Sequence, residues 1–252
     1  MQAALVLWDK HMRKFLRSRF ELVASLAIPL LLMGLFGVTM SRVMIHFQGD
    51  LNYIAYITPG VIAFTALTAC ILGGATLLSE RMNGAIKEYL VAPIPRLAVL
   101  VAAMGSGTAK ATIESCVIVL VAMALGVRPG GGGLIGWLVV IVAFLLFTLG
   151  FAAVTVAAAA GAHTSEAYHS SVTLLNVPLL FGSNALYPLM SMPLWLRILA
   201  YCNPTTYFID ALLNGWYGHP SQFGVALDLG LLLVFALLAL GLAERIFRRS
   251  VG

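Results

Sequence analysis

Residues 134–160 read LIGWLVVIVAFLLFTLGFAAVTVAAAA and contain no charged side chain. A helix needs about 20 apolar residues to cross a hydrocarbon layer roughly 30 Å thick, so this stretch can make one complete crossing. The rest of the chain continues the pattern, because 61% of its 252 residues are apolar and only 10% are charged. Soluble domains contain roughly 45–50% apolar and roughly 25% charged residues. We therefore expect an all-α membrane protein that crosses the bilayer several times.

Five further stretches are apolar and long enough to cross a membrane, which makes six predicted spans. Pro29 and Pro178 lie inside the first and fifth spans and should kink them. Residues 192–217 are ambiguous, so hydropathy alone also permits five or seven spans. We treat residues 1–252 as a single membrane domain. The predicted spans are residues 22–40, 56–79, 106–125, 134–160, 172–190 and 225–243.

Glycine and proline mark the breaks between spans. Pro59 and Gly60 are expected in the first turn of the second span, where proline is tolerated because an amide there has no helical partner. Arg128 and Pro129, followed by four glycines at 130–133, predict a flexible outer turn between the third and fourth spans.

Lysine and arginine are unevenly divided between the two sides of these spans, which indicates orientation. With the amino terminus in the cytoplasm, only Arg42, Arg128 and Arg197 lie outside. Both termini are then cytoplasmic, and the net charge of +5 requires no nucleic acid as a partner. We expect the plasma membrane, in a bacterium the inner membrane. The inner basic residues are Lys10, Arg13, Lys14, Arg17, Arg19, Arg81, Lys87, Arg96, Arg245, Arg248 and Arg249.

The first 20 residues predict an amphipathic helix in the inner headgroup layer. Apolar side chains from Leu5 to Phe15 recur at helical spacing, opposite a basic face that runs from Lys10 to Arg17. The following apolar stretch is longer than a signal-peptide core. A frayed tail is the alternative.

Residues 183–222 mix prolines, asparagines and aromatic side chains before the last span. Irregular backbone cannot face lipid with its polar groups unpaired. This segment is expected to form a broken, re-entrant hairpin in the outer leaflet, and a plain outer loop with an aromatic belt is the alternative.

Few residues suggest chemistry within this chain. Lys110 and Glu114 lie four apart in the third span, so they can form an intramembrane charge pair, with a structural role or a role in a transport path. His163, Glu166 and His169 lie at steps of three, where a metal site is conceivable but a solvated loop fits better. We expect no catalytic residues and no metal ligands.

A glycine-containing segment at residues 105–111 superficially resembles a phosphate-binding loop. The motif requires Gly before its lysine and Ser or Thr after it, whereas Ala109 and Ala111 flank Lys110. We therefore expect no ATP site in this chain.

The inner loop at residues 80–96, between the second and third spans, is the most informative stretch. Glu80 and Arg81 mark the exit from the membrane, Gly84 allows a bend, and Pro93 can stop a short helix. A short charged helix here is a plausible docking element for a cytoplasmic partner.

This loop resembles that of the membrane (permease) subunit of a type-2 ABC exporter, the class that includes drug-resistance and Nod-factor exporters. The chain departs from the family pattern at Ala85, where Thr is usual, and at Lys87, where an acidic residue is common. Residues 56–60 and the Asn203-Pro204 pair extend the resemblance over nearly the whole chain. The matching loop residues are Glu80, Arg81, Gly84, Glu88, Leu90, Pro93 and Arg96.

The resemblance implies a coupling helix within residues 80–93, seated in a separate ATPase subunit. Two permease copies, identical or different, and two ABC ATPases would form the transporter, with ATP and Mg²⁺ bound by the ATPases. This chain would need no cofactor. The coupling residues implied are Glu80, Arg81, Gly84, Ala85, Lys87, Glu88, Leu90 and Pro93.

The predicted substrate is a hydrophobic or amphipathic compound, either drug-like or a lipid, because apolar and Met- or Phe-bearing residues dominate the spans. Export of a lipid-linked glycan or polysaccharide is the alternative. An ion channel or a membrane-embedded enzyme is a more distant reading. The candidate path residues are Met33, Phe36, Phe64, Phe181 and Asn184.

Overall fold

A computed structural model describes residues 2–43, 52–84 and 96–250, and over these ranges the fold is all-helical. Five helical segments are long and apolar enough to cross a membrane: Phe20–Ser41, Tyr53–Met82, Ala98–Ala124, Gly133–Gly161 and Val225–Phe247. The elements are α1 (Gln2–Arg17), α2 (Arg19–Leu32), η1 (Met33–Gly37), α3 (Val38–Val43), α4 (Tyr53–Met82), α6 (Arg96–Ala124), α7 (Gly133–Gly161), α8 (Ser165–Phe181), η2 (Leu189–Ser191), α9 (Leu194–Tyr201), α10 (Pro204–Tyr217) and α11 (Val225–Ser250).

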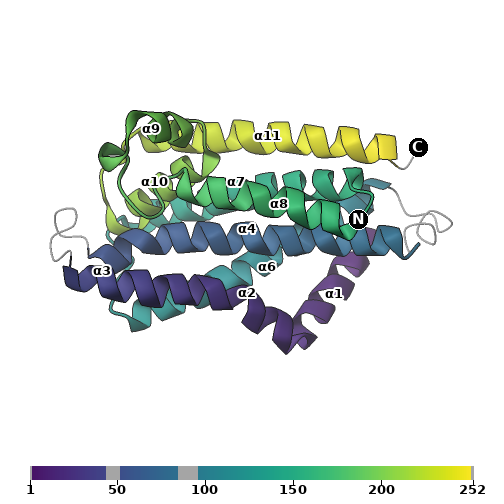
Figure 1. The fold of residues 1–252 in the computed structure, drawn as a ribbon, viewed down its shortest axis with the longest axis horizontal. Coiled ribbons are helices and arrows are strands. Elements are labelled where there is room, and N and C mark those ends of the chain that lie inside the picture. The colour runs from purple at the N-terminus through teal and green to yellow at the C-terminus, as the bar shows by residue number, and fades with distance from the viewer. Residues whose placement is uncertain (1, 44–51, 85–95, 251–252) are drawn as a thin grey trace.

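The long helices run side by side along the longest axis of the molecule (Figure 1). α4 lies at the centre, and nearly every residue of its first three turns is buried. At one end of the bundle α4 and α7 finish and both chain termini lie; we call this the coupling end. At the opposite end α6 leads into α7 through glycines 130–133; we call this the glycine-turn end.

Local sequence signals explain several helix starts. Side-chain oxygens of Ser18, Asn52, Thr164 and Asn203 accept hydrogen bonds from backbone amides in the first turns of α2, α4, α8 and α10. These residue types are preferred at the N-cap because they satisfy amides that have no helical partner. α4 begins at Tyr53, so Pro59 lies inside the helix rather than in its first turn, which corrects the expectation for the second span.

The first span is continuous but irregular. Pro29 lies inside α2, and the helix changes to π geometry at Met33–Gly37 before α3. A proline lacks the amide that would bond to the previous turn, and π turns are a recognised source of bends. The kink expected at Pro29 stays a prediction, and the π turn begins four residues further along the chain.

α8 differs from the predicted fifth span at residues 172–190. The helix begins earlier, at Ser165, and ends at Phe181, three residues after Pro178. The amide of Gly182 closes the last turn on the carbonyl of Pro178, and the chain then leaves the helix through Ser183 and Asn184. Pro178 thus lies in the last turn of α8 instead of kinking a longer helix.

Glycines bring α7 and α10 into backbone contact at the glycine-turn end. A Cβ atom on Gly132 or Gly136 would lie 2.2 Å from the carbonyl oxygen of Gly215. The amides of Gly130 and Gly131 donate to the carbonyl of Trp216. Glycines four apart allow such close packing of helices in membranes. The predicted flexible turn is therefore held by α10, and Gly132 within it is a packing residue.

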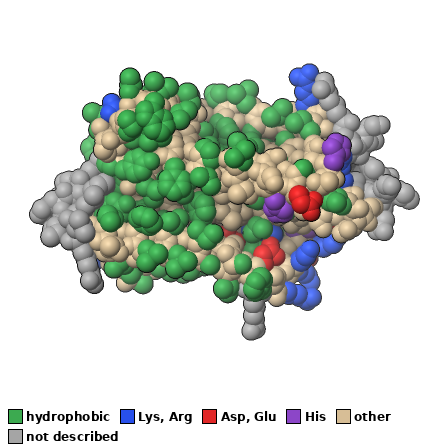
Figure 2. Space-filling model, in the orientation of Figure 1, with side chains coloured by type: hydrophobic (Ala, Val, Ile, Leu, Met, Phe, Trp, Pro, Cys, Tyr) green, Lys and Arg blue, Asp and Glu red, His purple; other side chains and the backbone are tan. Residues whose placement is uncertain are grey.

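Hydrophobic side chains cover much of the surface in Figure 2, while acidic, histidine and most basic side chains gather toward the coupling end. The exposed face of α11 is apolar, with Leu237 and Leu238 59% and 70% exposed. A water-soluble domain would bury such side chains, whereas a bilayer solvates them.

Candidate functional site

The predicted coupling loop begins where α4 ends. α4 finishes at Met82, and Gly84 has a positive φ of 77°. A glycine in this left-handed conformation is a common way to end a helix, because it has no Cβ to clash. The chain therefore turns at Gly84, as expected. The predicted coupling residues beyond it, Ala85, Lys87, Glu88, Leu90 and Pro93, lie outside the described residues.

Glu80 connects the end of α4 to the amino-terminal helix. Its Oε1 lies 3.1 Å from Nζ of Lys10 and 3.0 Å from Nε2 of His11. His11 is 4% exposed and Glu80 is half-buried, whereas Lys10 is exposed. The buried part of this contact is shielded from solvent, so it is worth more than a surface ion pair. Glu80 therefore holds α1 against α4.

Arg81 connects α4 to the end of α7. Its Nη1 donates to the carbonyl oxygens of Ala159, Ala160 and Ala162. The last carbonyls of a helix have no partner within it and carry a partial negative charge, so a guanidinium there stabilises the helix end. Arg81 thus caps α7 at the turn into α8.

Three elements therefore meet at the point where the coupling loop leaves the bundle. Glu80 faces α1, Arg81 faces α7, and Gly84 turns the chain away from α4. The sequence pattern assigned Glu80 and Arg81 to partner contact, but their described contacts lie within this chain. Sequence reasoning missed His11 because its partner is distant in sequence.

α1 is amphipathic as predicted, but part of its apolar face packs on α6. Met12 and Phe15 are buried, and Trp8 Nε1 donates to the carbonyl of Gly105 in α6 at 3.2 Å. Leu5 remains 62% exposed. The exposed basic side chains on the other face are Lys10, Arg13, Lys14 and Arg17.

The predicted direct pair of Lys110 and Glu114 is corrected by the structure. Lys110 Nζ lies 3.2 Å from Oε1 of Glu21 on α2, and Glu114 Oε1 accepts from Ser25 Oγ at 2.7 Å. Each α6 side chain thus reaches across to α2 instead of to its neighbour four residues away. Glu21 and Ser25 are also four residues apart, so each lies one helical turn from the other on the same face of α2. The two contacts are therefore one turn apart on both helices.

This polar seam fastens the first span to α6. Lys110 and Glu114 are 3% and 0% exposed, and the Lys110 ammonium also lies 4.9 Å from the centre of the Phe15 ring. Charged groups inside a membrane helix require such partners. In the described conformation both side chains are thus held by partners on the first span and on α1.

A double-mutant cycle should identify the true partner of Lys110. Lys110→Met is expected to lower stability by about 2–3 kcal/mol, because it leaves Glu21 without its cation. Adding Glu21→Met should recover about 1–2 kcal/mol of that loss. Thermal melting of the purified protein in detergent measures both. The matched cycle with Glu114→Met is the control, and stronger coupling of Lys110 to Glu114 would contradict the structure.

The five candidate path residues are not gathered around one cavity. Met33 is fully buried between the first span and α4, near Ile54 and Ile57. Phe36 and Phe181 are 45% and 49% exposed on the outside of the bundle. None of the five lines either apolar cavity described below. The path assignment thus remains a prediction, because neither of these two cavities within the described residues contains the candidate side chains.

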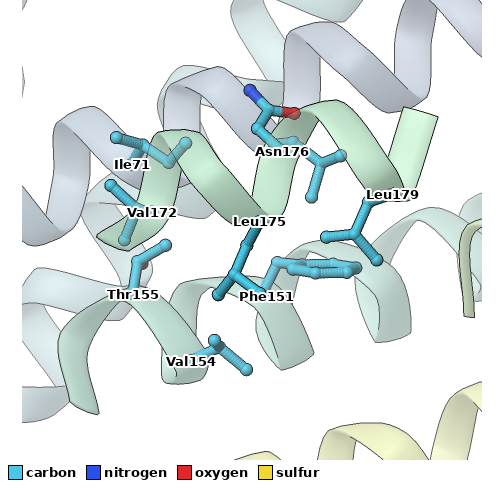
Figure 3. Close-up of a pocket in the computed structure, with 9 residues that line it drawn as sticks. Ile71, Phe151, Val154, Thr155, Val172, Leu175, Asn176 and Leu179 are labelled. Carbon is cyan, nitrogen blue, oxygen red and sulfur yellow. The ribbon is translucent and has the colours of Figure 1, made fainter. Parts of the chain in front are cut away.

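The seam between α8 and the pair α4 and α7 encloses a small cavity, shown in Figure 3. Leu175 of α8 points toward Phe151 of α7, and Val172 and Ile71 line the same space. Its volume is about 30 Å³. That is room for about one water molecule, and an apolar cavity of this size stays dry. It is a packing gap and is too small for a substrate.

The segment between α8 and α11 is anchored on α4 by two tyrosines. Tyr56 and Tyr53 donate to the carbonyls of Asn184 and Leu186, at 2.9 and 3.2 Å. Asn203 Nδ2 donates to the carbonyls of Leu179 and Gly182. The bond to Leu179 satisfies a carbonyl in the last turn of α8 that has no helical partner, and the others fix the backbone that follows the helix.

Two aspartates join α10 to the start of α11. Ser221 Oγ lies 2.8 Å from Asp210 Oδ2 and 2.9 Å from Asp228 Oδ2. Asp210 Oδ2 also accepts from the amide of Gln222 at 2.8 Å, so these contacts hold the connection between α10 and α11 in place.

The remaining sequence candidates lie at the α7–α8 turn and within α6. His163, Glu166 and His169 are exposed around the α7–α8 turn. Within the described ranges, no group of three His, Cys, Asp or Glu side chains is placed to hold a metal ion. Residues 105–111 lie inside α6, where Gly107 packs against Gly73 of α4, so they form a helix and not a phosphate-binding loop.

Comparison with known proteins adds a family to this geometry. Residues 2–217 match the family described as ABC-2 type transporter. Among curated proteins, the chain is 29% identical over 226 residues to ycf38 of Cyanophora paradoxa, which its name describes as a transport permease; the match covers 88% of this chain and 76% of that protein.

Two bacterial proteins are also similar. The inner membrane transport permease YadH of Escherichia coli (strain K12) is 24% identical, over 91% of this chain and 88% of YadH. The daunorubicin resistance ABC transporter permease protein DrrB1 of Streptomyces coeruleorubidus is 25% identical, over 94% of this chain and 83% of DrrB1.

Proposed function

Because the chain belongs to the ABC-2 type transporter family, we propose that it is the permease of an ATP-driven exporter and that its α4–α6 connection transmits the motion of a separate ATPase. As a permease of this family it is a multi-pass membrane component of a transporter. The observation that carries the proposal is the junction at the end of α4, where Glu80 and Arg81 join α1 and α7 beside the turn at Gly84.

The junction suggests how a push on the loop would reach the bundle. A force applied beyond Gly84 acts on α4, which is bonded at that end to both α1 and α7. α7 packs in turn against α10 and α11. Packed helices move as rigid bodies more readily than they bend, so these elements would tilt together. The ATPase would hold ATP and Mg²⁺, and this chain would supply the path.

We propose six crossings with both termini in the cytoplasm. α7 finishes at the coupling end, where Arg81 caps it. The segment after α8 is anchored at the opposite end by Tyr53, the first residue of α4. α8 therefore leads from one end of the bundle to the other, although its 17 residues span only about 25 Å. Residues 183–222, with the buried α10, would form the re-entrant outer hairpin.

The proposed assembly contains two ATPases and two permease copies, identical or different, in a plasma membrane. A two-fold axis is the commonest symmetry for such pairs. The proposed substrate is hydrophobic or amphipathic, drug-like or lipid. The apolar composition of the spans, which is rich in Leu, Val, Phe and Met, favours such a compound over a glycan, which needs polar partners. The name of DrrB1, a daunorubicin resistance permease, agrees with it.

Gly84→Pro tests the coupling role. Proline fixes φ near −65° and cannot adopt the 77° found at Gly84, so the chain must leave α4 in another direction. We expect membrane insertion and folding to persist, while substrate-dependent ATPase activity of the complex with its co-purified ATPase falls about tenfold or more. Gly84→Asn is the matched control, because asparagine tolerates positive φ.

Two measurements separate the outcomes. Affinity purification in mild detergent shows whether an ATPase co-purifies, and vesicle transport shows whether it drives the permease. Normal transport by Gly84→Pro would exclude the coupling role, and a wild-type chain that retains no ATPase would exclude the exporter.

A further inference from the structure

A second, much larger cavity opens on the flank of the bundle between α6 and α7. Its volume is about 430 Å³. The floor is buried and comes from α4, α7 and α10, whereas the rim is formed by exposed side chains such as Leu120 and Ile141. We call it the α6–α7 cleft. It is lined by Ile62, Thr112, Ser115, Cys116, Val119, Leu120, Trp137, Val140, Ile141, Phe144, Leu145, Leu212 and Trp216.

The glycine contact between α7 and α10 accounts for this cleft. Gly136 and Gly215 touch backbone to backbone, so α7 is drawn onto α10 at the glycine-turn end. α6 approaches α4 more closely than α7: a Cβ on Gly73 of α4 would lie 2.9 Å from the Cα of Gly107, whereas a Cβ on Gly107 would lie 3.8 Å from the side chain of Ala152 in α7. The flank between α6 and α7 is therefore left open, and side chains of α10 form part of the floor of the cleft.

The depth of the cleft matches one leaflet of a membrane. Trp137 and Leu145 lie four and twelve residues after Gly133, the first residue of α7. At about 1.5 Å per residue, the cleft extends from about 6 Å to about 18 Å below that end of the helix. Half of a hydrocarbon layer roughly 30 Å thick is about 15 Å. The cleft therefore occupies the hydrocarbon half nearest the glycine turn.

The surface of the cleft is apolar and uncharged. The Thr112 hydroxyl donates to the carbonyl of Thr108 in its own helix, and the buried Ser115 presents no polar surface to the space. Binding sites for drug-like molecules usually include a few polar groups that fix orientation. The polar groups of this lining expose almost no surface to the space, so the cleft suits a plain hydrocarbon chain. Trp137 lies near the glycine-turn end of the cleft, at the depth where aromatic side chains are enriched at the membrane interface.

We propose that the α6–α7 cleft holds one acyl chain of a membrane phospholipid from the leaflet at the glycine-turn end. In the proposed orientation this is the outer leaflet, but the inference needs only the membrane crossing of α6 and α7. A flexible chain fills a concave apolar space without a complementary protrusion, which a second copy would have to supply. The lipid would complete the packing between α6 and α7.

Photolabelling with a phospholipid tests the proposal. The purified protein is reconstituted in phosphatidylglycerol–phosphatidylethanolamine vesicles that contain phosphatidylcholine with a diazirine on one acyl chain, and labelled peptides are mapped by mass spectrometry. We expect label concentrated on residues 112–120 and 137–145. Cys116→Phe, which fills the cleft from the α6 rim, should reduce that label about tenfold.

Matched variants keep the test decisive. Met123→Phe adds the same ring to α6 outside the cleft, at a side chain 51% exposed, and should leave the labelling unchanged. Ile141→Phe fills the cleft from α7. It should reduce the label to the same extent as Cys116→Phe, and it replaces that variant if Cys116→Phe fails to fold. Label spread evenly over the exposed faces of α6, α7 and α11 would overturn the proposal.

A second copy over the cleft would also overturn it. With Cys70 and Cys202 replaced by alanine, Cys116 is the remaining cysteine of the three. Efficient cross-linking of two copies through Cys116 with a short bismaleimide would show that protein, not lipid, covers the cleft. Absence of that product together with localised photolabel is the expected result.

Discussion

Gly136→Ala is expected to lower the melting temperature of the protein in detergent by about 6–12 °C. The new methyl group would lie 2.2 Å from the carbonyl oxygen of Gly215, and the obstacle is backbone rather than a movable side chain. α10 must therefore shift, which costs about 3 kcal/mol, the upper part of the usual range for overpacking. In a chain of this size, each 1 kcal/mol corresponds to roughly 2–4 °C.

Gly241→Ala is the matched control. Gly241 also lies in a membrane-crossing helix, but nothing lies within 4 Å of its missing Cβ. Alanine favours helix by about 1 kcal/mol over glycine, so this variant should melt at the same temperature or slightly higher. Equal melting of the two alanine variants would show that the contact between α7 and α10 is looser than described.

Arg81→Met is expected to loosen the end of α7. Loss of the guanidinium leaves the carbonyls of Ala159, Ala160 and Ala162 without their donor. Hydrogen bonds to a charged group contribute about 2 kcal/mol, so the amides of residues 157–164 should exchange roughly 30-fold faster. Hydrogen–deuterium exchange with mass spectrometry measures this change, and Arg81→Lys should preserve much of the protection because it keeps a charged donor.

The same experiment distinguishes the two roles available to Arg81. A cap on α7 predicts faster exchange in the isolated permease, without any ATPase present. Unchanged exchange at residues 157–164, with loss of the co-purified ATPase, would instead return Arg81 to the partner contact expected from the loop pattern.

Local features were predictable from the sequence because their causes lie within a few residues. Membrane-crossing helices follow from uninterrupted apolar runs, and five of them are present. The turn at Gly84 follows from a glycine behind a helix. The exposed basic face of α1 follows from helical spacing.

Features that depend on a distant partner were not predictable. Lys110 could pair with Glu114 by spacing alone, and only the position of α2 brings Glu21 to it. Residues 172–190 are apolar enough to continue as a helix, yet α8 ends at Phe181, where Asn203, Tyr53 and Tyr56 bind the backbone around its end.

The sequence by itself therefore determined an all-helical membrane chain, its main crossings and the loop that relates it to transport permeases. Only the tertiary structure decided which side chains join the helices, that Glu80 and Arg81 bind α1 and α7, and that glycines draw α7 onto α10. The physical reason is the separation along the sequence of the residues that interact. Hydropathy and helix ends are set by neighbours along the chain, whereas ion pairs, helix caps and backbone contacts are set by residues that meet only after the helices pack.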